Sequence, residues 1–264
     1  MTTDLGFWTL QTLNALQLSM LLFLLSVGLT VIFGLMHFVN LAHGALYALG
    51  AYAAALSHMH WQFNALGASL AGVAAAALAA VWMGKLLKRS TGVYLAMLSL
   101  AFAQMVWASA SQWVSLTGGD NGLIGLQFFS AMPRWVFQVA LILLCFVSLF
   151  GFSRLVRSSF GAALQAGRDA PQRAQASALN VVKLNQRVFL MSAALAGLSG
   201  SFWAISKGAV FPSVASISNS VDALMVVLLG GVHHLWGALA GSVFLVGGGS
   251  EIGRHFEYWR GVLG

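Results

Sequence analysis

The chain has 264 residues and a formal net charge of +7; hydrophobic residues make up 59% of it and charged residues only 7%. A soluble domain carries roughly 25% charged residues, so this composition excludes an ordinary soluble protein. The basic residues fall in loops between apolar runs, which is the positive-inside pattern of membrane proteins and does not indicate nucleic-acid binding. The expected fold class is therefore all-α, a polytopic integral membrane helical bundle surrounded by membrane lipid.

The first apolar segments define the N-terminal half. Residues 8–34 are long enough to cross a bilayer, and no basic stretch precedes them, so they are expected to stay as a membrane helix. The next segment, 37–56, is interrupted by Asn40, His43 and Gly44. Polar groups at membrane depth are costly unless they pair or face a cavity, so we expect a broken or re-entrant helix lining a path. The open alternative is that Asn40 and His43 only make interhelical hydrogen bonds that lock the packing.

Residues 63–87 and 93–113 are the next two expected spans. The basic stretch 85–89 closes the first of them and marks its cytoplasmic end. The second opens into the turn-rich stretch 115–126, which should then be external and present backbone donors. A plain loop between helices is the other interpretation of this stretch.

Two further spans are expected at 135–152 and 188–206, followed by an external loop at 207–220. The apolar runs 221–232 and 238–246 are each too short for a comfortable helical crossing of the ~30 Å hydrocarbon core. They are expected to be half-helices or thin crossings extended by their flanks. In total the sequence predicts about eight hydrophobic segments, some of them broken.

The longest polar stretch, 153–187, holds six of the thirteen Lys and Arg residues and should be cytoplasmic. Asp169 is placed to cap a short helix that starts at Pro171 and extends to Val182. Apolar residues recur on it at spacings of three to four, giving a small-residue face. Such a helix suggests a docking element for a soluble partner, and a solvated loop is the alternative.

Several chemistries have no motif here. The sequence lacks a G-x-x-x-x-G-K-[ST] phosphate loop, so the chain is not expected to bind ATP or hydrolyse it, and no catalytic pair is evident. His233, His234 and His255 lack Cys or carboxylate partners at ligand spacing, so no metal site is expected. The lone Cys145 lies in an apolar run and is expected to be buried. With only six carboxylates, an ion-coupled carrier is disfavoured, and any pumping should draw its energy from another subunit.

Four stretches together resemble a known family, the permease subunits of branched-chain amino acid ABC importers. They are GLTVIFGLMHFVNLAHGALYALGAY (28–52), YLAMLSLAFAQMVWASASQWVSLTGGDNGL (94–123), the loop GRDAPQRAQASALNV, and LAGLSGSFWA followed by LLGGVHHLWGALAG (228–241). The likeness covers about 28–250. The first stretch is similar to one of the two paired permease subtypes and the Thr-Gly-Gly stretch to the other. This chain departs from the family at 178–180, where Ala-Leu-Asn replaces Gly-Ile-Asn, and at 230–234, where Gly-Gly-Val-His-His replaces Gly-Gly-x-Gly-Ser. The family usually continues with one more hydrophobic helix, so the resemblance implies a chain that is short or truncated after Gly264.

The resemblance implies a single permease domain, 1–264, that forms half of a translocation path in the bacterial inner membrane. The implied partners are a second permease subunit in a heterodimer, two cytoplasmic ATP-binding subunits and a periplasmic substrate-binding protein, with ATP bound by the partners and no cofactor here. The implied substrates are branched-chain amino acids or related small amides and organic solutes. A secondary carrier or channel for a small polar solute is the alternative. The expected path or gate residues are Asn40, His43, Gly44, Thr117, Gly118, Gly119 and Asn121. The expected ATPase-coupling residues are Arg168, Asp169, Pro171, Arg173, Ala174, Ala178, Leu179 and Asn180.

Overall fold

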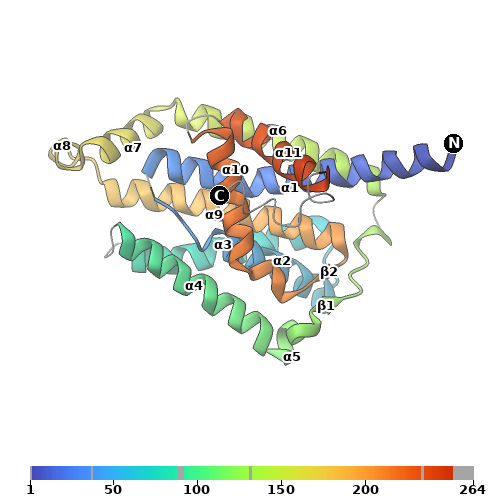
Figure 1. Ribbon diagram of the computed structural model, residues 1–264. Coiled ribbons are helices and arrows are strands. Elements are labelled where there is room, and N and C mark those ends of the chain that lie inside the picture. The colour runs from blue at the N-terminus through green and yellow to red at the C-terminus, as the bar shows by residue number, and fades with distance from the viewer. Residues whose placement is uncertain (1, 37, 88–91, 131–132, 233–234, 252–264) are drawn as a thin grey trace.

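The computed structural model describes residues 2–36, 38–87, 92–130, 133–232 and 235–251. Helices dominate these ranges, with short 3-10 turns and one strand pair between them (Figure 1). In chain order the elements are α1 (Thr2–Met36), α2 (His43–Trp61), α3 (Ala65–Leu87), α4 (Val93–Gln112), α5 (Val114–Thr117), η1 (Gly119–Asn121), β1 (Leu123–Ile124), η2 (Phe128–Ser130), α6 (Arg134–Val156), α7 (Ser159–Asp169), α8 (Pro171–Ala176), α9 (Val181–Lys207), β2 (Ala209–Val210), η3 (Pro212–Ala215), α10 (Ile217–Gly230) and α11 (Leu235–Glu251).

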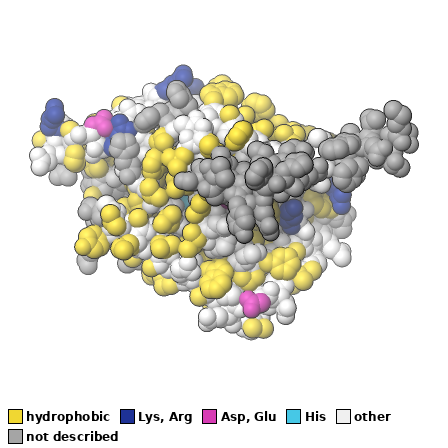
Figure 2. Space-filling view, in the orientation of Figure 1, with side chains coloured by type: hydrophobic (Ala, Val, Ile, Leu, Met, Phe, Trp, Pro, Cys, Tyr) yellow, Lys and Arg dark blue, Asp and Glu magenta, His cyan; other side chains and the backbone are white. Residues whose placement is uncertain are grey.

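Within the described ranges, five helices are long and apolar enough to cross a membrane: α1, α3, α4, α6 and α9. The predicted all-α membrane bundle is therefore confirmed, whereas the count of about eight segments stays a prediction. α1 and α9 are largely buried, while α3, α4 and α6 expose apolar side chains such as Leu70 and Phe150. Much of the flank shown in Figure 2 is hydrophobic, as expected of a surface that faces lipid.

Glycines let α2, α3 and α9 approach closely at the centre of the bundle. A side chain at Gly50 of α2 would overlap the backbone of Gly197 of α9, and one at Gly200 would overlap the carbonyl of Tyr47. The Ser201 hydroxyl also donates to the Gly50 carbonyl oxygen across 3.3 Å. Because lipid gives membrane helices no hydrophobic reason to associate, such close packing and interhelical hydrogen bonds hold them together.

The chain is not helical at 38–42, between α1 and α2. At the start of α2 the His43 imidazole Nε2 lies 2.8 Å from the carbonyl oxygen of Leu25, near the middle of α1. Leu25 is eleven residues before the end of α1 at Met36, or about 16 Å along the helix axis at 1.5 Å per residue. The chain therefore turns back beside α1 before α2 begins, which confirms the predicted broken segment.

α10 is the second helix that starts inside the bundle. A side chain at Gly44, in the first turn of α2, would contact Ser220, in the first turn of α10. At 14 residues α10 is about 21 Å long, less than the hydrocarbon core. α10 ends near the end of α1, where the Val232 carbonyl lies close to Gly34. α11 then packs back against α10, with Gly237 against Gly230. The two short runs thus form a helical hairpin; His233 and His234 lie outside the described residues.

The loops sort to two ends of the bundle. β1 pairs antiparallel with β2, Leu123 opposite Val210, so stretches 115–126 and 207–220 meet at one end. α7 and α8 project at the other end (Figure 1). The amide of Gln186, near the start of α9, donates to Gly84, which places the basic end of α3 there as well. This arrangement matches the predicted grouping of cytoplasmic and external loops, although residues 88–89 lie outside the described ranges.

The stretch 153–187 is more helical than predicted, and the expected helix from Pro171 to Val182 is wrong at its C-terminal end. α8 starts at Pro171 but ends at Ala176, because Ala178 adopts a left-handed backbone with φ of 59°. The Leu179 N–H donates to the Ala174 carbonyl oxygen at 3.1 Å, the six-residue closure of a Schellman motif. The next residue, Asn180, then caps α9.

Candidate functional site

The non-helical entry to α2 is held by two serines from other helices. The Leu41 N–H donates to Ser99 Oγ of α4 at 3.1 Å. Ser220 Oγ of α10 accepts from the Gly44 N–H and donates to the Leu41 carbonyl oxygen, both at 2.8 Å. We call Ser99 and Ser220 the serine clamp. Non-helical backbone at membrane depth must have its polar groups satisfied by the protein, and the clamp does this.

Asn40 and His43 belong to the same entry segment and are fully buried. Asn40 Oδ1 accepts from the Ala42 N–H at 3.0 Å, a local turn that competes with helix formation and accounts for the break. The His43 ring is bonded to the Leu25 carbonyl, so it does fasten α2 to α1. Asn40 Nδ2 and His43 Nδ1, however, have no hydrogen-bond partner among the described residues.

These two unpaired atoms lie where the first turns of α2 and α10 meet. Each helix N-terminus carries a partial positive charge and backbone N–H donors. An amide donor at Asn40 beside two such termini suits an oxygen-rich polar or anionic group better than a cation. Within the described ranges no cluster of three or more His, Cys, Asp or Glu residues could hold a metal ion.

The second predicted cluster, Thr117 to Asn121, forms a compact turn after α4. Thr117 is buried, and its hydroxyl lies 2.7 Å from the Ala110 carbonyl oxygen and 2.8 Å from that of Trp113. Gly118 has φ of 74°, and a side chain there would overlap the Gly122 backbone, so glycine is required.

The structure does not bring this turn together with Asn40. On α4 the entry segment contacts Ser99 and the turn contacts Ala110. The eleven residues between those contacts correspond to about 16 Å. The two groups of expected path residues therefore lie at different depths of the bundle.

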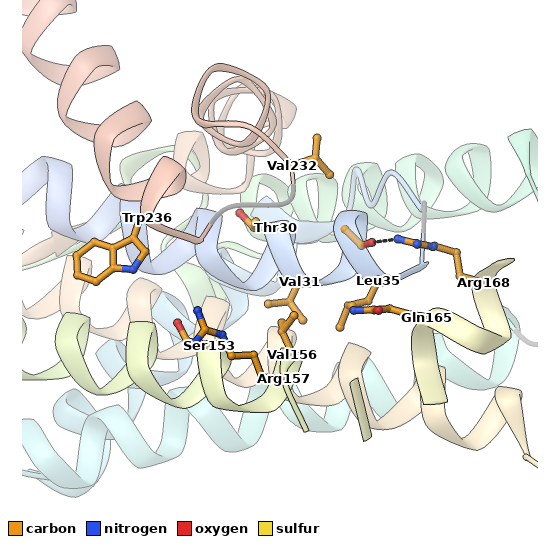
Figure 3. Close-up of a pocket in the computed structure, with 11 residues that line it drawn as sticks. Thr30, Val31, Leu35, Ser153, Val156, Arg157, Gln165, Arg168, Val232 and Trp236 are labelled. Atoms are coloured by element: carbon orange, nitrogen blue, oxygen red, sulfur yellow. Dashed lines mark hydrogen bonds between the residues drawn. The ribbon is translucent and has the colours of Figure 1, made fainter. Parts of the chain in front are cut away.

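Arg168 connects the polar stretch to the core. Its Nη1 donates to the Gly34 carbonyl oxygen at 2.6 Å, near the end of α1 (Figure 3). Its Nε lies 2.7 Å from the carboxylate of Asp169. Asp169 is the last residue of α7 and Ala170 separates it from Pro171, so the predicted cap lies in the preceding helix. Among the expected coupling residues, Arg168 thus joins α7 to the helix that leads into Asn40.

The other expected coupling residues do not share one outward face. Ala174 is buried, whereas Ala178 is exposed, so the predicted small-residue face from Ala174 through Leu179 is wrong. Asn180 Oδ1 accepts from the Lys183 N–H at 3.0 Å and so starts α9. Arg173 is exposed near the tip of the projection.

The serine clamp has no signature in the sequence. Ser99 stands in an apolar stretch and Ser220 among the polar residues of 216–222, and a serine in a membrane helix usually bonds to its own helix. Ser99 itself does so, since its hydroxyl donates to the Ala96 carbonyl oxygen at 2.7 Å. Only their placement beside the broken segment, 58 and 179 residues from Leu41, reveals the shared role.

Comparison with known proteins gives a match over nearly the whole chain. A family model described as "Branched-chain amino acid transport system / permease component" matches residues 11–260. No solved structure gives a significant match.

The curated relatives include both LivM and LivH proteins, described as high-affinity branched-chain amino acid transport system permease proteins. The chain is 29% identical to LivM of Escherichia coli, in a match covering 96% of this chain and 66% of LivM. It is 30% identical to LivM of Salmonella typhimurium, covering 94% of this chain and 65% of that protein. With LivH of Escherichia coli the identity is 23%, over 89% of this chain and 82% of LivH. The chain thus spans just under two thirds of the length of the two LivM proteins.

Proposed function

Because the chain belongs to the family of branched-chain amino acid transport system permease components, we propose that it is a membrane subunit of an ATP-driven importer. It forms half of a translocation path for branched-chain amino acids or related small amides and organic solutes. The match over residues 11–260 carries this proposal, since it includes the entry segment, the clamp and the α7–α8 projection.

The proposed complex contains a second permease subunit, two cytoplasmic ATP-binding subunits and a soluble substrate-binding protein in the periplasm. Its proposed location is the bacterial inner membrane, and ATP is bound by the partners. Two observations support the division of labour. The apolar spans hold few charged residues that could couple transport to an ion gradient. The basic projection formed by α7 and α8 stands at one end of the bundle, where a soluble subunit can reach it (Figure 1).

The α7–α8 projection is the proposed ATPase-docking element. Ala178 is exposed at its Schellman turn, and Arg173 is exposed on α8. Arg168 then links any movement of the projection to α1 through the Gly34 carbonyl. Exposed ion pairs contribute only about 0–1 kcal/mol, so Arg173 should tune docking, while apolar contacts supply most of the binding energy.

Purification of the tagged chain from host membranes in mild detergent tests the proposal. The chain should copurify with an ATP-binding protein, and proteoliposomes of the complex should accumulate leucine or a related solute only with ATP and binding protein. Uptake by the isolated chain driven by a proton or sodium gradient would favour the secondary carrier.

Docking is tested by Ala178→Glu, which should release the ATPase or abolish its stimulation by binding protein. Ala178→Gly is the matched control, because it adds no charge and suits the left-handed backbone. Arg173→Ala should be mild. Wild-type copurification and ATPase stimulation in Ala178→Glu would exclude this docking surface.

The path assignment is tested by Asn40→Ser. Serine can still accept from the Ala42 N–H in a local turn, but it lacks the unpaired amide donor. Transport should fall about tenfold with normal complex yield, which is the loss expected for one hydrogen bond of about 1.4 kcal/mol. Asn64→Ser, a substitution between two good helix caps, is the control, because Asn64 Oδ1 accepts from the Gly67 N–H at 2.8 Å and Asn64 belongs to neither expected site. Normal transport with a destabilised complex would show that Asn40 only fastens helices.

A further inference from the structure

A cavity of about 310 Å³ lies at the α7 end of the bundle, between α1, α6, α7 and the α10–α11 hairpin. Its polar lining consists of Thr30, Ser153, Arg157, Gln165 and Arg168, with no carboxylate among the described residues that line it. Figure 3 shows Arg157 running back along α6 toward Ser153, while Arg168 enters from α7.

The two arginines differ in how they are paired. Arg168 is engaged by the Gly34 carbonyl and the Asp169 carboxylate. Arg157 has no ion-pair partner within the described residues. The cavity therefore holds one positive charge that the described part of the protein does not balance, beside the neutral amide donor of Gln165. The Ser153 hydroxyl already donates to the Leu149 carbonyl oxygen at 2.6 Å. Arginine is the side chain best suited to binding phosphate, through its planar set of donors.

An apolar groove of about 150 Å³ lies between α1, α6 and α11, three of the helices that also border the cavity. Phe23, Leu149 and Leu239 line the groove, whereas Thr30, Ser153 and Trp236 of the same helices line the cavity. On each helix the groove residue and the cavity residue are close in sequence. They are seven residues apart on α1, four on α6 and three on α11, or roughly 10, 6 and 4 Å of helix rise. We call the cavity and the groove together the crevice. The crevice is polar and basic near the end of the bundle and apolar just inside it.

We propose that this crevice binds one anionic glycerophospholipid. The phosphate lies between Arg157 and Arg168, with the Gln165 amide as a further donor, and an acyl chain occupies the groove between α1, α6 and α11. Trp236 lies at the boundary, where amphipathic aromatic rings are favoured at the membrane interface. Basic pockets between membrane helices on the cytoplasmic side bind anionic headgroups, and the α7 end is the side assigned to the cytoplasm by its charge. The lipid would then bridge α7 to α1 and α11.

The chain offers matched controls for both halves of the site. Arg154 is one turn from Arg157 on α6 but lines a different hollow, toward α9. Val243 lines the groove, and the adjacent Phe244 does not, although both are about half exposed. Arg157→Gln and Val243→Trp therefore test the headgroup and the acyl chain, with Arg154→Gln and Phe244→Trp as controls.

Native mass spectrometry of the detergent-purified protein, titrated with phosphatidylglycerol or phosphatidylcholine of identical acyl chains, measures binding. Wild-type protein should bind one phosphatidylglycerol in preference to phosphatidylcholine. Arg157→Gln should weaken that binding about fivefold, the effect expected for one basic residue near an anionic surface. Val243→Trp should also weaken it, because the larger side chain fills the groove that the acyl chain would occupy. The two control variants should bind as the wild type does.

Three results would overturn the proposal. One is equal affinity for the two lipids, and another is an equal loss in Arg154→Gln and Arg157→Gln. The third is displacement of the lipid by millimolar inorganic phosphate with no effect of Val243→Trp, which would indicate a soluble anion as the ligand.

Discussion

Replacing Ser220 by alanine should destabilise the protein more than any comparable serine substitution in the bundle. Ser220→Ala removes the acceptor of the Gly44 N–H and the donor to the Leu41 carbonyl, both at 2.8 Å. Interhelical hydrogen bonds in membranes average about 0.6 kcal/mol each, whereas a buried group left unpaired costs about 1–3 kcal/mol. Ser220→Ala leaves two backbone groups, the Gly44 N–H and the Leu41 carbonyl, without this partner. We therefore expect the free energy of unfolding to fall by about 1–3 kcal/mol.

Ser242 provides the matched control, because each of the two serines is 1% exposed. The Ser242 hydroxyl donates only to Leu239, one turn earlier in its own helix. Ser242→Ala removes no hydrogen bond between helices among the described residues, so its effect on the free energy of unfolding should be under about 0.5 kcal/mol. Unfolding of both variants in graded mixtures of denaturing and mild detergent measures the difference.

Amide hydrogen exchange over Leu41–Gly44 adds a local readout. Ser220→Ala should accelerate exchange of this segment beyond the change in global stability, since the Gly44 N–H has lost its acceptor. Equal destabilisation by the two alanine variants, with unchanged exchange at Leu41–Gly44, would refute the clamp.

Three further predictions follow from the fold. With the single cysteine replaced by alanine, Gln172→Cys should react with a membrane-impermeant maleimide only from the cytoplasmic side; labelling of intact cells from outside would reverse the topology. Ala178→Gly should slow amide hydrogen exchange in α8 about fivefold, because the left-handed backbone costs alanine about 1 kcal/mol. Ala176→Gly, inside the helix, should instead speed this exchange. Gly50→Leu should abolish folding because it overlaps α9, while Gly151→Leu, with nothing within 4 Å, should be tolerated in a yield and thermal-stability assay.

The long spans could be predicted because length and apolarity are local properties of the chain. The expected span 93–113 became α4, Val93–Gln112, with its start unchanged. The break at Asn40 was also predictable, since a polar side chain with a local turn competes with helix at membrane depth. The start of α9 was placed seven residues late, at 188, because its first two turns are polar and extend beyond the apolar run.

The relative positions of the functional candidates could not be predicted. Asn40 and Thr117 are similar as sequence signals, but Leu41, next to Asn40, contacts α4 at Ser99, whereas Thr117 contacts it at Ala110. The left-handed Ala178 was missed because alanine is the strongest helix former, and the turn is stabilised instead by the bond from Leu179 to Ala174. The partnership of Ser99 and Ser220 depends on tertiary contacts that no local pattern encodes.

The bond between Gly44 and Ser220 also constrains the order in which the protein can be assembled during synthesis. Ser220 follows Gly44 by 176 residues, so the partner of the Gly44 N–H leaves the ribosome long after α2 has been made. At about 5–20 residues per second this interval lasts on the order of ten seconds or more. Backbone groups without partners are costly in hydrocarbon, so the beginning of α2 must stay hydrated or be shielded by the insertion machinery until α10 arrives. The central break can therefore become part of the bilayer-embedded core only after α10 has been synthesised.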